Sequence, residues 1–154
     1  MKMNPTRGFT LMEIVTAITI VLILLGIGIG TFYRQRSTSQ IKPIADGIVA
    51  ILEHAKADAV AGKNGSNFGV NFGSTTYTYF SGSSYNASDP NNLVNTISSQ
   101  FVINDTIAGG SSIIFARLSG TPSATGTITV SDTQDSSDTK IVSVGSGGEV
   151  GVVQ

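Results

Sequence analysis

A single apolar run near the N-terminus constrains this chain more than any other feature. Between Phe9 and Tyr33 lie 25 residues with one charged side chain, Glu13, and residues 14–29 carry no charge. A bilayer core about 30 Å thick is spanned by roughly 20 apolar helical residues. Because a lone strand cannot satisfy its backbone hydrogen bonds in lipid, the run predicts a membrane-spanning helix over residues 9–33.

Composition excludes several classes of function. The 154 residues include no cysteine, one histidine, and 9 Lys+Arg against 10 Asp+Glu. Without thiols the chain can form no disulfide scaffold, thiolate metal site or cysteine nucleophile, and one histidine does not make a histidine-based metal site. The sequence contains neither a glycine-rich nucleotide-binding motif nor a serine-hydrolase elbow. We therefore expect no catalytic residues, no metal site, no cofactor and no enzymatic activity.

A second, amphipathic segment follows the apolar run. It opens with a basic collar, by which we mean residues 34–42 with the cations Arg34, Arg36 and Lys42. Residues 44–62 place apolar side chains at helical spacing on one face, which predicts an amphipathic helix. We expect one long helix from about residue 9 to about residue 62, softened near the glycines at 26–30 and kinked or interrupted at Pro43.

Residues 63–154 differ in character and predict antiparallel β structure. Alternating segments at 67–72 and 75–80, separated by Gly73-Ser74, predict a hairpin. A turn is expected at Asn104-Asp105. The fold class is therefore α+β, in which a long N-terminal helix packs on one face of a sheet of six or seven strands. The other expected strands lie at 100–103, 111–118, 126–132, 139–145 and 149–153.

The eight residues before the apolar run form a short basic leader. Lys2 and Arg7 are its cations, Gly8 ends it, and Phe9 begins the run. The carboxylate of Glu13 costs free energy in lipid and has no basic partner on its own helix face. A cut between Gly8 and Phe9 would create an α-amine, mostly cationic at neutral pH, and this amine on a neighbouring copy could pair with Glu13.

The string GFTLME at residues 8–13, followed by 16 uncharged residues, resembles the class III signal sequence of type IV pilins and type II secretion pseudopilins. The resemblance implies that a prepilin peptidase cuts after Gly8 and methylates the Phe9 amine. It implies that Glu13 then helps to dock the subunit into a helical filament. The implied partners are the peptidase, other pilin or pseudopilin subunits, an inner-membrane assembly platform, and membrane lipid before assembly.

The tail carries a second resemblance, to the C-terminal half of the GspH/FimT-like minor pseudopilins. Members of that group associated with DNA uptake carry Arg after the last glycine of this pattern. Here that glycine is Gly148, and Glu149 follows it. Residues 43–154 hold four Lys+Arg and nine Asp+Glu, a net charge of −5. Because phosphate binding needs clustered cations, we expect no binding of nucleic acid. The resemblance covers residues 113–132 and the glycine-rich end of the chain, with matching positions at Gly120, Pro122, Gly126 and Gly148.

The expected organisation has four parts: a leader at 1–8, a membrane and assembly helix at 9–33, an amphipathic second half at 34–62, and a β domain at 63–154. The β domain is expected outside the cytoplasm, on a single-pass inner-membrane subunit that later enters a filament. Basic residues flank the run on both sides, so the positive-inside rule does not set this orientation.

Several alternatives remain open at this stage. The first residues could instead be an ordinary signal peptide, cut near Gly30. The chain could be a plainly anchored β domain, or a pilus-associated module that binds DNA or a surface ligand. The filament could be a secretion pseudopilus or a type IV pilus. The absence of cysteine favours a minor or pseudopilin subunit.

Three local features have modest interpretations. His54 is expected at the surface of the amphipathic helix. The acidic residues Asp132, Asp135 and Asp138 are expected in a solvated turn rather than in a calcium site. The uncharged aromatic stretch at 68–85 is expected to be a half-buried hairpin rather than a contact surface.

Overall fold

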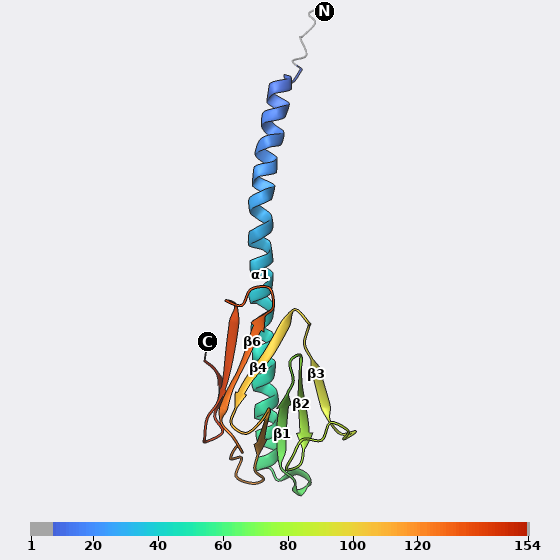
Figure 1. The fold of residues 1–154 in the computed structure, drawn as a ribbon, viewed down its shortest axis with the longest axis vertical. Coiled ribbons are helices and arrows are strands. Elements are labelled where there is room, and N and C mark those ends of the chain that lie inside the picture. Colours follow the sequence, from blue (N-terminus) through green and yellow to red (C-terminus); the bar gives the residue numbers. More distant parts are fainter. Residues whose placement is uncertain (1–7, 154) are drawn as a thin grey trace, which may run out of the picture. The chain divides into compact units, whose positions relative to one another are not determined.

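The computed structural model describes the backbone of residues 8–153, and the side chains of residues 8–25 and 40–153. A long helix, α1 (Leu11–Val60), is followed by a short 3-10 turn, η1 (Lys63–Gly65), and then by β-strands to the end of the chain (Figure 1). The chain divides into two compact units, Met1–Arg36 and Ser37–Gln154. The prediction of one long helix followed by β structure is confirmed.

Helix α1 runs through Pro43 without a break, so the alternative in which this proline interrupts the helix is wrong. Proline removes one backbone hydrogen bond from a helix interior. Here Ile41 and Ala45, on either side of it, are both fully buried. Most helical stability in proteins comes from such packing, which offsets the lost bond.

The strands form two four-stranded antiparallel sheets rather than one. In the first sheet the order is β3-β2-β1-β5, and in the second it is β4-β6-β7-β8. The first sheet consists of β1 (Phe68–Phe72), β2 (Thr76–Ser81), β3 (Leu93–Thr96) and β5 (Ser112–Phe115). The second consists of β4 (Phe101–Ile107), β6 (Gly126–Asp132), β7 (Thr139–Val144) and β8 (Val150–Val152).

The predicted hairpin is present as β1 and β2, but the turn predicted at Asn104-Asp105 is wrong. Both residues lie within β4, where Asn104 pairs with Thr129 and Asp105 with Ile128. The strand tolerates them because its faces alternate: Phe101 and Ile103 are buried, whereas Asn104 is exposed. The short strand β3 was not predicted.

One apolar core joins the second half of α1 to both sheets. The buried helix residues recur every three or four positions, as the amphipathic pattern predicts, and the sheets contribute Phe115 and Val130 among others. Figure 1 shows this part of α1 running alongside the strands. The prediction that the helix packs on the β domain is confirmed. The fully buried helix side chains are Ile41, Ala45, Ile48, Leu52, Ala55 and Ala59.

A polar cluster fastens the end of α1 to strand β2. The Asp58 carboxylate accepts hydrogen bonds from Lys63 Nζ at 2.5 Å and from the Tyr79 hydroxyl at 2.6 Å. The hydrogen bond from Lys63, and next that from Tyr79, lower the pKa of Asp58 below its ordinary value of 3.8. Burial, and next the bond to Asp58, raise the pKa of Tyr79. His54 lies half-exposed beside this cluster, as expected, with its ring 5.2 Å from that of Tyr79.

We expect Asp58→Asn to lower the free energy of unfolding by about 1–3 kcal/mol at pH 7, because it weakens two hydrogen bonds to a charged group. Since the folded-state pKa of Asp58 is lowered, its contribution is complete above the unfolded-state value of 3.8 and is lost as pH falls through the folded-state value. The difference in the free energy of unfolding between Asp58→Asn and the parent chain should therefore become smaller in strong acid. Urea titrations at several pH values measure it.

The matched control for this prediction is Asp46→Asn. Asp46 also bonds a lysine on α1, Lys42, at 2.6 Å, but both side chains are at least half-exposed. Exposed pairs contribute about 0–1 kcal/mol, so this variant should change little. The prediction would be contradicted if both variants lost the same free energy of unfolding, or if the loss for Asp58→Asn did not change with pH.

Candidate functional site

The helix begins directly after Thr10, which caps it. The backbone N–H of Glu13 donates to Thr10 Oγ1 at 3.3 Å and to the Thr10 carbonyl oxygen at 3.1 Å. Threonine at the cap with glutamate three positions later is the capping-box sequence. Gly8 and Phe9 precede the cap and are not helical. The peptide bond between them therefore lies outside the helix.

The start of the apolar helix, after this cap, is exposed along its described length. Its large apolar side chains between Phe9 and Leu25 are each 50–82% exposed. The hydroxyls of Thr16 and Thr19 donate to the carbonyl oxygens of Met12 and Val15, so their polar groups are satisfied inside the helix. The segment thus presents an apolar surface interrupted by a single carboxylate, Glu13. Apolar surface of this extent indicates a membrane or protein contact.

Among the residues that the structure describes, no helix is both long and apolar enough to cross a bilayer. Part of the predicted span, residues 26–33, has side chains outside the described set. The leader cations Lys2 and Arg7 also lie outside the described residues. The membrane span and the leader therefore stay predictions.

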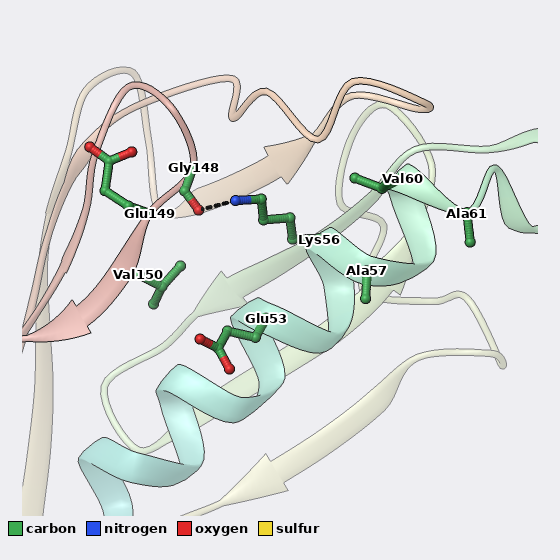
Figure 2. A pocket seen from close by; sticks show the side chains of 8 residues that line it. All are labelled: Glu53, Lys56, Ala57, Val60, Ala61, Gly148, Glu149 and Val150. Atoms are coloured by element: carbon green, nitrogen blue, oxygen red, sulfur yellow. Dashed lines mark hydrogen bonds between the residues drawn. The ribbon is translucent and has the colours of Figure 1, made fainter.

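A second feature is an open groove of about 640 Å³ at the C-terminal end of α1 (Figure 2). The ammonium of Lys56 crosses from α1 and donates to the carbonyl oxygen of Gly148 at 2.8 Å. This contact holds the turn that precedes β8 against the helix. The groove is lined by Glu53, Lys56, Ala57, Val60, Ala61, Gly148, Glu149 and Val150.

Two glycines make this close packing possible. Gly120 and Gly148 have φ of +67° and +75°, in the left-handed region that favours glycine. A Cβ on Gly148 would lie 2.9 Å from the Gly120 carbonyl oxygen, and one on Gly120 would lie 2.6 Å from a methyl carbon of Val60. The structure thus brings together two positions of the tail resemblance that are distant in sequence, at the end of α1.

The acidic loop is only partly as predicted. Asp132 is the last residue of β6 and is buried, so the expectation of a solvated turn is wrong there. Its carboxylate accepts hydrogen bonds from Gln100 Nε2 at 3.0 Å and from the Gln134 backbone N–H at 2.7 Å. Within the part of the chain that the structure describes, no three acidic or histidine side chains are placed to hold a metal ion.

The N-terminal segment matches a known family model. Residues 3–29 match the prokaryotic N-terminal methylation motif, and the matched range includes Gly8, Phe9 and Glu13. This motif coincides with the capped, exposed apolar helix. A search of curated protein sequences finds no match.

The fold matches solved structures over most of the chain. The type IV minor pilin FimU of Pseudomonas aeruginosa aligns with a TM-score of 0.60 and 12% identity, over 79% of this chain and 92% of its own. The fold of this chain is pilin-like. The minor pseudopilin EpsH from the type 2 secretion system of Vibrio cholerae aligns with a TM-score of 0.58 and 14% identity, over 74% of this chain and 96% of its own. At such identities the likeness establishes the fold of this pilin-like chain.

Proposed function

We propose that this pilin-like chain is a structural subunit, minor pilin or minor pseudopilin, of a type IV pilus or a type II secretion pseudopilus. In this proposal a prepilin peptidase cuts between Gly8 and Phe9 and methylates the new amine of Phe9. The leader cations Lys2 and Arg7 stay on the removed peptide. The chain itself carries out no chemical step.

One observation supports the proposal above all: the methylation motif includes a helix whose large apolar side chains, from Phe9 to Leu25, are each at least half-exposed in the described part of the chain. Such a surface needs lipid or other apolar helices around it. Before assembly the inner membrane would supply this environment, with the β domain outside the cytoplasm. In the filament, the helices of neighbouring subunits would supply it, after an assembly platform has received the subunit.

Glu13 has a role in the same step. A carboxylate in an apolar surrounding requires a partner charge. The Phe9 amine of a neighbouring subunit, which exists only after the leader is removed, would provide that charge. The pair would fix the axial register between packed helices, a use for which buried charged groups are known.

The mature N-terminus tests this proposal. We expect mass spectrometry of the chain, purified from cells that assemble such filaments, to find Phe9 as its first residue with one methyl group on the amine. A Gly8→Val variant should keep its leader, because the added side chain would clash with the peptidase at the residue before the cut, where this chain has only a glycine. A mature chain that starts at Thr31 would support the signal-peptide alternative, and an uncut chain would support the plain anchor; either would overturn the proposal.

A further inference from the structure

Strand β3 leaves one edge of the first sheet open. It pairs with β2 on one side, and it is the last strand of that sheet on the other. Figure 1 shows β3 on the far side of β2 from β1. The side chains of Leu93 and Val94 are 56% and 59% exposed, and Thr96 is exposed as well. An apolar strand edge is thus accessible on the surface of the globular unit.

The hydrogen-bond pattern shows which backbone groups this edge presents. Residues in an antiparallel ladder alternate between pairs that exchange backbone hydrogen bonds and pairs that do not. The N–H of Ile97 donates to the Thr75 carbonyl oxygen at 2.9 Å, so by the register of the two strands Asn95 also bonds to β2. Val94 and Thr96 therefore direct their N–H and carbonyl groups away from β2. The open edge offers two donors and two acceptors.

The other three edges of the described sheets are protected. On β5, the Ile114 carbonyl oxygen accepts the Ser123 N–H at 2.7 Å, and the Ile114 N–H donates to Ser123 Oγ at 3.1 Å. On β4, the Ile103 N–H donates at 2.8 Å to a carbonyl oxygen of the β1–β2 turn, and the strand carries the charge of Asp105. Strand β8 has three residues and follows Glu149 directly. Covering segments, charges and short strands are the usual protection against edge-to-edge pairing.

Strand β3 has neither a charge nor a proline, and residues 64–104 hold a single charged side chain, Asp89. Leu93 lies on the same face of the sheet as its partner Tyr79, and Val94 lies on the opposite face. A strand added beside β3 would thus cover one apolar side chain on each face while it bonds the free backbone groups. A helix could not do this, because its own backbone groups are already paired. The edge therefore selects an extended chain.

We propose that β3 binds an extended, uncharged strand of a different subunit in the same filament, which extends the first sheet by one strand. The inference rests on the proposed function, which supplies the neighbouring subunits. The added strand would form backbone hydrogen bonds with Val94 and Thr96. Its own side chains would pack on Leu93 and Val94.

Val94→Pro tests the backbone contact, because proline removes the outward N–H and leaves the bonds between β3 and β2 in place. We expect about tenfold less of this variant in sheared filaments, relative to its amount in the membrane, which is the upper range for one lost hydrogen bond. Val94→Thr keeps the N–H and should enter filaments normally. The matched control is Val152→Pro. By the same alternation Val152 directs its N–H away from β7, because Val153 bonds to Ile141, and this variant should also enter normally.

Amide hydrogen exchange of the parent chain, measured by mass spectrometry, tests the contact without a substitution. In detergent micelles the amides of Val94 and Thr96 should exchange rapidly, because neither donates to β2. In sheared filaments their exchange should be at least tenfold slower. Rapid exchange of both amides in filaments would overturn the inference, even if Val94→Pro is lost from filaments because it folds poorly.

The remaining outcomes separate this inference from the proposed function. If the parent chain and Val94→Pro enter filaments equally, the subunit assignment stands and the strand contact is wrong. The chain has no native cysteine, so two differently tagged copies with Thr96→Cys can report on self-pairing. A disulfide dimer with both tags would identify a second copy as the occupant and overturn the choice of a different subunit. If the parent chain never enters the filament fraction, the proposed function fails and the inference falls with it.

Discussion

Replacing Glu13 by Ala or by Lys should leave membrane insertion intact and remove the chain from filaments. A charged side chain at the centre of a membrane helix costs about 2.5–3.5 kcal/mol on insertion scales, and less near the end of the span, where Glu13 lies, so neither replacement hinders insertion. In a packed bundle of apolar helices, by contrast, the amine of a neighbouring Phe9 would lose its counter-charge. Breaking a buried pair in this way costs about 3–5 kcal/mol, which corresponds to at least a hundredfold loss of incorporation.

The measurement compares the chain in the membrane fraction with the chain in sheared filaments. Glu13→Lys should be more severe than Glu13→Ala, because it places a second cation beside the amine. Thr16→Ala is the matched control one turn along the helix: its hydroxyl donates to the Met12 carbonyl oxygen of its own helix, so its loss should leave incorporation unchanged. Normal incorporation of both Glu13 variants would reject the docking role.

Much of the fold follows from local patterns. The spacing of the buried residues from Ile41 to Ala59 predicts the face that α1 presents to the core, because burial and helical period coincide. The β1–β2 hairpin follows from two alternating segments joined by Gly73-Ser74. These elements are specified by residues close together in sequence.

The partners of the strands could not be predicted in the same way. Alternation tells which side chains of a strand are buried, but not which strand it joins. β1 pairs with β5, so that Phe68 lies opposite Phe115, although 47 positions separate them. β4 pairs with β6 and belongs to the other sheet. The division into two sheets depends on these long-range pairings, which no local motif encodes.

The two candidate sites differ in the same way: one is local in sequence and the other depends on a long-range contact. Gly8, Phe9 and Glu13 lie within six residues and form a motif that a sequence reveals directly. The groove depends on the contact between Lys56 and Gly148, whose positions differ by 92. From periodicity Lys56 belongs to the polar face of the amphipathic helix, together with Glu53, and nothing in the local sequence indicates that its ammonium reaches a distant turn.

Phe115→Ala is the substitution from which we expect the largest loss of stability. Phe115 is fully buried at the edge of the first sheet and belongs to the core shared with α1. Removing a buried phenylalanine ring costs about 3–5 kcal/mol, for lost transfer free energy and the cavity left behind. Because domains of this size are stable by about 5–15 kcal/mol, the variant should lose about a fifth or more of its stability.

Urea unfolding of the full chain in a mild detergent measures this loss, followed by the near-ultraviolet circular dichroism of the tyrosines. Val94→Ala is the control on the same sheet: Val94 is 59% exposed, so its truncation should change stability by less than about 0.5 kcal/mol. Gly8 and Phe9 lie in the other compact unit. Phe115→Ala should therefore still lose its leader at the normal rate, whereas a parallel loss of processing and stability would show that the peptidase requires the folded β domain.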